Sequence, residues 1–195
     1  MALNSADVRV GISGAICFAP VGTRAPQNAT DPLPEIWRDV GYLSEDGIEE
    51  ERTRSLQETT AWQNADVVRV SVTSASFTTV FTMIETNRNS LELYYGRPVA
   101  ADGSIVIDPG ETGPRRAMIV DYVDGDAFCR LHMPEVQVTE VDTQTVNSSD
   151  PVGYTNTITA YRNRSARYAA KKWYSALATD TDTGDEGDAG EGEAT

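Results

Sequence analysis

The sequence predicts a mainly β domain, a sandwich or a barrel, with one short α-helix. Several segments alternate apolar and polar side chains with a period of two, which is typical of half-buried strands. Aspartate–glycine pairs at 46–47 and 124–125 mark turns between such segments. Helical spacing is convincing in one stretch only, RNSLELYY at residues 88–95. About eight strands are expected, as in a small all-β fold.

The first strands are expected at residues 8–12 and 15–20, with a turn at Gly14. A long loop punctuated by prolines follows, and Trp37 is expected to anchor it on the core. Residues 40–51 then read as a hairpin that turns at the first aspartate–glycine pair.

Residues 52–65 are polar and weakly patterned, so a long exposed loop between strands is predicted there. Residues 74–84 fit both a helical stripe and one face of a strand, and their β-branched side chains favour the strand. Thr86 or Asn87 is placed to cap the following helix, which Gly96 ends.

The clearest hairpin is residues 115–133, with its turn at the second aspartate–glycine pair. Residues 135–146 and 153–162 alternate and are predicted strands. The basic segment 162–177 fits either a helix or a strand.

The chain divides into a β domain, residues 1–178, and an acidic tail, residues 179–195. The tail has seven acids, no cation and no apolar residue larger than alanine, so we expect it to be disordered. It carries half of the net charge of −14. Such a charge argues against binding to nucleic acid or to an anionic membrane. No secretory signal or membrane span is recognised, so the chain reads as soluble and cytoplasmic when synthesised.

Catalytic and metal-binding patterns are missing from the sequence. Cys17 and Cys129 are expected to be reduced, buried thiols, and they give zinc too few ligands together with the one histidine, His132. No nucleophile elbow and no phosphate-binding glycine loop is present. The sequence therefore predicts no enzyme, metal or cofactor, with paired carboxylates for glycoside hydrolysis as the open alternative.

The order and spacing of several stretches resemble the major tail tube proteins of long-tailed bacteriophages with non-contractile tails (siphovirus type). They are VRVGISGAICFAPVGTRAP, EIWRDVGYLSEDGIEEE, TAWQNADVVRV leading to IETN and LELYYG, and the closing DPVGYTNTITAYRN, and they span residues 8–165. The resemblance implies a tail-tube-type β-sandwich or barrel that forms hexameric rings. It implies that the rings stack into a hollow tube through which DNA passes into the host without specific binding.

The same resemblance implies partners and a location. The partners are further copies of the chain and the tape-measure, tail terminator and tail tip proteins, with no membrane. The location is the virion tail, assembled in the host cytoplasm. The loop predicted at residues 52–65 falls where the family reaches to the adjacent ring.

Three consecutive glutamates, Glu49 to Glu51, include candidates to line the bore of such a tube. On a strand, Glu49 and Glu51 face one side, whereas Ile48 and Glu50 face the other. If the first side lines the bore, these acids repel DNA phosphates within about 8 Å, the Debye length. The alternative is a solvated edge strand that charge protects from aggregation.

Exposed aromatic residues are the candidate anchors between subunits. Trp62 stands in an otherwise polar segment, and Trp173 with Tyr174 forms a second candidate. For Trp62 the alternative is local packing beneath its own loop.

Two other functions also fit the sequence. One is a carbohydrate-binding β-sandwich on a virion or cell surface. The other is a head–tail, decoration or terminator protein that forms a single ring. The acidic tail is expected on the outer wall of a tube, as a solubility tail or as a brake on premature polymerisation.

Overall fold

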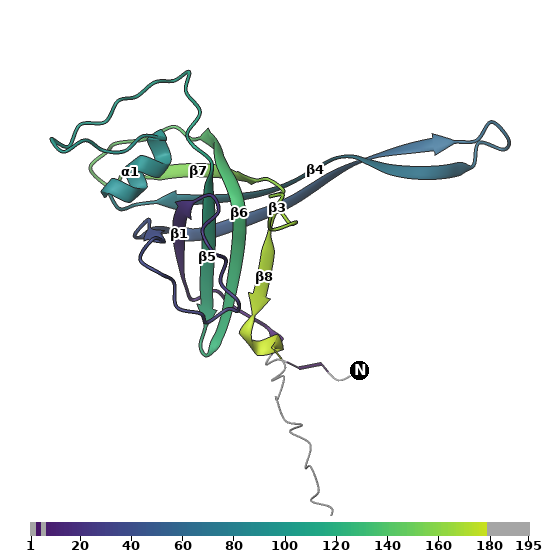
Figure 1. Cartoon of the computed structure of the whole chain (residues 1–195), viewed down its shortest axis with the longest axis horizontal. Helices are drawn as coiled ribbons and strands as arrows, with labels where there is room; N and C mark the ends of the chain where they lie inside the picture. Colours follow the sequence, from purple (N-terminus) through teal and green to yellow (C-terminus); the bar gives the residue numbers. More distant parts are fainter. Residues whose placement is uncertain (1–2, 5–6, 179–195) are drawn as a thin grey trace, which may run out of the picture.

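The computed structural model of the chain describes residues 3–4 and 7–178. Within them the chain forms one antiparallel sheet of eight strands, one α-helix and a short 3-10 helix (Figure 1). The predicted mainly β class with one short helix is therefore confirmed. The predicted acidic tail, residues 179–195, lies outside the described residues.

The sheet joins segments from the whole chain. Its order is β2-β1-β5-β6-β7-β4-β3, and β8 pairs with β6. The elements are β1 (Ser13–Pro20), β2 (Arg38–Asp39), β3 (Leu43–Thr60), β4 (Val67–Met83), α1 (Arg88–Tyr95), β5 (Arg116–Asp124), β6 (Ala127–Val141), β7 (Tyr154–Ala160), β8 (Lys171–Tyr174) and η2 (Ser175–Leu177).

Strand β6 connects the two halves of the sheet. One of its edges pairs with β5. The other edge pairs with β8 through Cys129–His132 and with β7 through Val136–Val141. The register with β5 shifts beside Pro134, so β6 carries a bulge near the point where it changes partner. In Figure 1 the strands β5, β6 and β8 run across β3, β4 and β7.

Side chains from both halves meet in one core, so the single sheet folds over on itself in the manner of a sandwich. Burying a large apolar side chain of this kind contributes about 1.5–3 kcal/mol. The core includes Ile16 and Phe18 of β1, Phe81 and Met83 of β4, Leu93 of α1, Met118 and Val120 of β5, Leu131 and Met133 of β6, and Ile158 of β7. The period-two pattern of β7, and of β4 from Phe77 to Met83, arises because every second residue there points into the core.

Helix α1 begins and ends where the sequence predicts. The side chain of Asn87 accepts hydrogen bonds from the amides of Asn89 and Ser90, both at 2.8 Å. Gly96 ends the helix with φ of 74°, a conformation that glycine adopts without strain.

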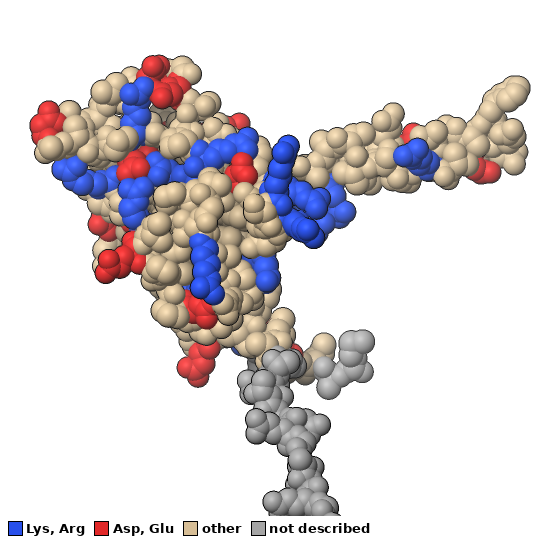
Figure 2. All heavy atoms as spheres, in the orientation of Figure 1, with Lys and Arg blue, Asp and Glu red and all other residues tan. Residues whose placement is uncertain are grey.

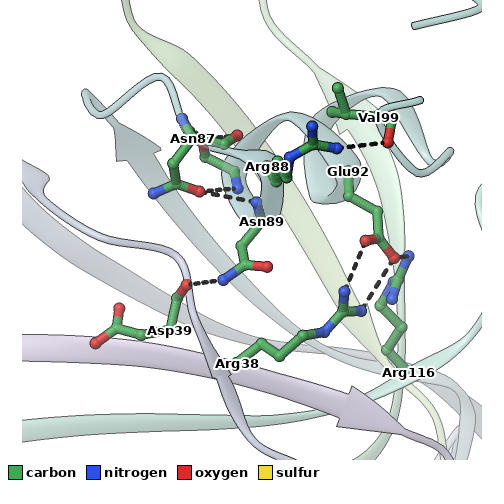
Figure 3. A network of polar contacts seen from close by, with 9 residues as sticks. Arg38, Asp39, Asn87, Arg88, Asn89, Glu92, Val99 and Arg116 are labelled. Carbon is green, nitrogen blue, oxygen red and sulfur yellow. Dashed lines mark hydrogen bonds and ion pairs between the residues drawn. The ribbon is translucent and has the colours of Figure 1, made fainter. Parts of the chain in front are cut away.

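An ion-pair network holds the helix on the sheet (Figure 3). The Glu92 carboxylate accepts two hydrogen bonds from Arg38, at 2.7 and 3.0 Å, and one from Arg116, at 2.7 Å. Burial by itself would raise the pKa of Glu92, but the two guanidinium groups lower it below its ordinary value. Glu92 therefore ties α1 to both β2 and β5.

The predicted hairpin at residues 40–51 is wrong. Strand β3 does not turn at the aspartate–glycine pair: Leu43 pairs with Met83 and Ile48 with Phe81, so residues 44–47 bulge from a strand that continues. The turn-like sequence forms a bulge because β3 pairs with β4 rather than with itself.

The predicted loop at residues 52–65 is also wrong, although the segment is exposed. Strand β3 runs on to Thr60, and the chain reverses at residues 61–66, where the Ala61 amide donates to the Asp66 carbonyl at 2.8 Å. The pattern is weak because neither face of this strand is buried in the chain.

The remaining expectations are mostly confirmed. Residues 74–84 belong to strand β4 almost throughout, Trp37 is buried, and Asp124 pairs with Ala127 across the predicted turn. The basic segment left open forms β8 and η2. Residues 8–12, however, are not a strand and Gly14 is not a turn, since β1 begins at Ser13 and Gly14 pairs with Tyr122 within it.

Candidate functional site

The outer face of the sheet formed by β6, β7, β4 and β3 is lined by hydroxyl and carboxylate groups. It lies opposite the core because neighbouring residues on a strand face opposite sides, and cross-strand partners share a side. We name this surface the threonine face. Its members are Glu49, Glu51 and Thr53 of β3, Ser76, Thr78, Val80 and Thr82 of β4, Gln137, Thr139 and Glu140 of β6, and Thr155, Thr157 and Thr159 of β7.

The hydroxyl groups of the threonine face bind one another across the strands. The Thr82 and Thr155 hydroxyls lie 2.7 Å apart, and those of Thr139 and Thr159 lie 3.0 Å apart. None of the members is a lysine or an arginine. The face is therefore an ordered polar surface with negative charges and without cations.

The predicted alternation of the three glutamates is confirmed. Ile48 packs against the core, and Glu50 on the same side forms an ion pair with Lys172 at 2.6 Å. Glu49 and Glu51 are exposed on the opposite side, within the threonine face.

A third acid of this face, Glu140, was missed by the sequence reasoning. Strict alternation would place Glu140 on the core side together with Val136 and Val138. The register shifts between Val138 and Glu140, so Glu140 stands opposite Thr157 on the threonine face. The sequence holds no signal for this bulge, because it depends on pairing with β7.

The second surface is a two-stranded ribbon, made of residues 52–60 of β3, the turn 61–66 and residues 67–76 of β4. Strand β4 pairs with β7 only from Phe77 onward, so within the described chain the ribbon strands pair with each other alone. Figure 1 shows the ribbon projecting far from the body. An isolated two-stranded ribbon is marginally stable in water, so it gains stability from a partner.

One side of the ribbon carries an uncovered row of apolar side chains. Leu56 and Val72 face each other there, and Val68 and Val70 continue the row, all more than half exposed. Trp62 at the tip is 97% exposed, so the alternative of packing beneath its own loop is wrong. A projecting apolar row with an exposed tryptophan is typical of an interaction surface.

The second pair of candidate anchors lies on β8. The ring of Trp173 is half-buried, 6.4 Å from the His132 ring, and the Lys171 ammonium lies 4.6 Å from its centre. Tyr174 is 43% exposed. Trp173 thus contributes to packing within the chain, and a role for either residue between subunits stays a prediction.

The sequence matches a protein family described as phage tail tube protein over residues 1–183. The chain belongs to this family. Tail tube proteins self-assemble into tubes and are structural components of the virion tail, not enzymes. The carbohydrate-binding alternative is therefore set aside.

Solved structures similar to this tail tube protein share little sequence with it. The virion of a native gene transfer agent (GTA) particle gives 10% identity and a TM-score of 0.40, covering 89% of this chain and 98% of that one. The tail of an empty GTA particle, with C6 symmetry, gives 9% identity and a TM-score of 0.41, covering 82% of this chain and 95% of that one. The crystal structure of Hcp protein gives 9% identity and a TM-score of 0.32, covering 82% of this chain and 96% of that one. No curated protein matches the sequence.

The two thiols of the tail tube protein are poorly placed for nucleophilic chemistry. Burial raises the pKa of Cys17 to about 12 and also raises that of Cys129, so neither supplies a thiolate near neutral pH. In the part of the chain that the structure describes, no group of His, Cys, Asp and Glu residues is placed to hold a metal ion. No helix among the described residues is long and apolar enough to span a membrane.

Proposed function

We propose that this tail tube protein forms hexameric rings that stack into the tube of a long, non-contractile phage tail, with the threonine face lining the bore. The genome passes along this bore into the host. The proposed partners are further copies of the chain and the tape-measure, tail terminator and tail tip proteins.

The observation that carries the proposal is the absence of cations among the members of the threonine face. Each lysine or arginine that neutralises a phosphate adds to DNA affinity, with a salt slope of about −0.9 per contact. A tube repeats every side chain many times, so even one cationic position would hold the DNA. Carboxylates and mutually bonded hydroxyls instead leave the polymer free to slide.

The ribbon supports the stacking part of the proposal. Its apolar row and Trp62 have no cover within the described chain, and its length carries them away from the body. A neighbouring ring that buries this row would stabilise the ribbon and the tube together.

A charge-reversal experiment tests the bore. The double variant Glu49→Lys, Glu51→Lys is expected to assemble into tubes that retain DNA. Retention should weaken steeply between about 50 and 200 mM salt, since each added lysine contributes a phosphate contact. DNA release from variant phage, or DNA binding by reconstituted tubes, provides the measurement.

The matched control is the double variant Asp102→Lys, Asp126→Lys, which changes the net charge equally at two exposed turn residues. Its tubes should release DNA as the unsubstituted tubes do. Equal DNA retention by both variants would show that Glu49 and Glu51 do not face the bore.

Removal of the ribbon anchor tests the stacking. Trp62→Ala is expected to leave a folded subunit that polymerises poorly, whereas Val106→Ala, which trims another exposed side chain, should polymerise normally. Negative-stain microscopy separates tubes from single rings and from free subunits. Normal tubes from Trp62→Ala would count against the anchor. Rings of the unsubstituted chain that never stack would favour the single-ring alternative.

A further inference from the structure

A cationic groove lies where the ribbon leaves the body. Its volume is about 640 Å³. Its floor is apolar, from Phe77, Leu131, Ala160, Ala169 and Ala170, and its rim carries Arg52, Arg54, Arg162 and Lys172. We name it the arginine groove. Figure 2 shows lysine and arginine side chains gathered at the root of the ribbon.

The groove carries uncompensated positive charge. Glu50 is the single acid among its lining residues, and Lys172 neutralises it at 2.6 Å. Arg52, Arg54 and Arg162 form no ion pair with any residue of the described chain. Three exposed guanidinium groups beside an apolar floor suit an extended, acidic peptide.

We propose that the acidic tail, residues 179–195, docks in the arginine groove of its own chain. The tail carries seven carboxylates and no cation, which complements the three free arginines. Its glycines, alanines and threonines are small enough to let an extended backbone follow a shallow groove. Nucleic acid is the less favourable occupant, because the chain as a whole carries a net charge of −14.

The tail is attached close enough to reach. Lys172 on the groove rim precedes the last described residue, Ala178, by six positions. The 17 residues of the tail span up to about 58 Å when extended, at about 3.4 Å per residue. A short tether gives an effective concentration on the order of 1 mM. A groove that binds the free peptide only with a Kd of about 1 mM is thus about half occupied.

Docking would bear on assembly. Arg52 and Arg54 lie on the same side of β3 as Leu56, by the alternation of the strand. A tail in the groove therefore sits at the root of the apolar row that the proposed function assigns to the neighbouring ring. The docked subunit is the less competent one for assembly. This consequence rests on the proposed function, whereas the docking does not.

Paramagnetic NMR on the full chain tests the docking. A nitroxide is attached through Ala189→Cys, and Cys17 and Cys129 are expected to react slowly because burial raises the pKa of both thiols. The amides of Phe77, Ala169 and Ala170 should broaden at low salt. The broadening should disappear at about 1 M salt, where the Debye length falls to about 3 Å.

Two matched double variants carry the same label. Arg54→Gln, Arg162→Gln removes two groove cations and should abolish the broadening. Arg9→Gln, Arg24→Gln removes two exposed cations elsewhere and should preserve it. Absence of broadening in the labelled chain that keeps all its arginines, or equal broadening in both double variants, would overturn the docking. In a mixture of nitroxide-labelled chains with isotope-labelled chains that carry no nitroxide, the amides of the isotope-labelled chains should not broaden. Broadening of those amides would overturn the contact within one chain.

Replacing the seven tail acids by Asn and Gln tests the consequence for assembly. If half of the subunits are docked, the critical concentration for polymerisation should fall about twofold. Broadening with an unchanged critical concentration would overturn the brake and leave the docking standing. Subunits that show the broadening but never form tubes would instead contradict the proposed function.

Discussion

The buried histidine makes the stability of the subunit depend on pH. His132 lies on β6 with its ring against Trp37, 5.9 Å between centres, and its Nδ1 atom 3.0 Å from the Tyr168 hydroxyl. Burial, and to a lesser degree the charge of Lys171, lowers the pKa of His132 to about 4. The imidazole is therefore neutral in the folded chain throughout the physiological range.

The size and the sign of the effect follow from linkage. The unfolded chain binds this proton at a pKa of about 6.5, the folded chain only at about 4, so acid favours unfolding between these values. The full difference between the two pKa values corresponds to about 3 kcal/mol of folding stability. At pH 5 about 2 kcal/mol of it should already be lost, whereas above pH 7 the contribution is fully present.

Urea unfolding of the monomeric chain at pH 7, 6 and 5 provides the assay. Glu92 and Glu135 also make stability depend on pH, because their pKa values are lowered in the folded chain. The stability that they contribute is lost only near pH 4.5 and below, so the window from pH 7 to 5 reports on His132. His132→Gln should lower stability at pH 7 but flatten the profile between pH 7 and 5. An equal slope in both proteins would refute the assignment of the effect to His132.

Three further predictions concern the helix and its attachment, each read as a free energy of unfolding. Glu92→Gln should cost at least about 2 kcal/mol, because it leaves Arg116, a buried residue, without its carboxylate. Glu111→Gln, in the exposed pair with Arg97, should cost under about 1 kcal/mol, and equal losses would contradict the importance of burial. Gly96→Ala should cost about 1–3 kcal/mol, since φ at Gly96 is 74° and an added Cβ would lie 2.8 Å from the Gly113 Cα. Gly110→Ala introduces neither problem, so a similar loss of stability in that variant would argue against backbone strain at Gly96. Asn87→Ala should cost about 1 kcal/mol through the lost cap, while Asn87→Asp should retain most of it, and an unchanged stability in Asn87→Ala would show that the cap contributes little.

Local patterns were enough to predict much of this fold. The alternation of β4 and β7, the turn after Asp124, and the cap and stop of α1 at Asn87 and Gly96 all appear as predicted. So does the division of the three glutamates between two sides of β3. These features depend on residues within a few positions of one another, so the chain carries their signals locally.

Tertiary structure alone decided where those elements find partners. The segment 52–60 became a strand because β4 offers it backbone partners, although no face of it is buried. Glu140 reached the threonine face through a bulge that pairing with β7 creates. Glu92 meets Arg38 and Arg116 from 54 and 24 residues away. A sequence period reports burial along one strand, whereas register, bulges and charge pairs depend on which distant segment lies alongside.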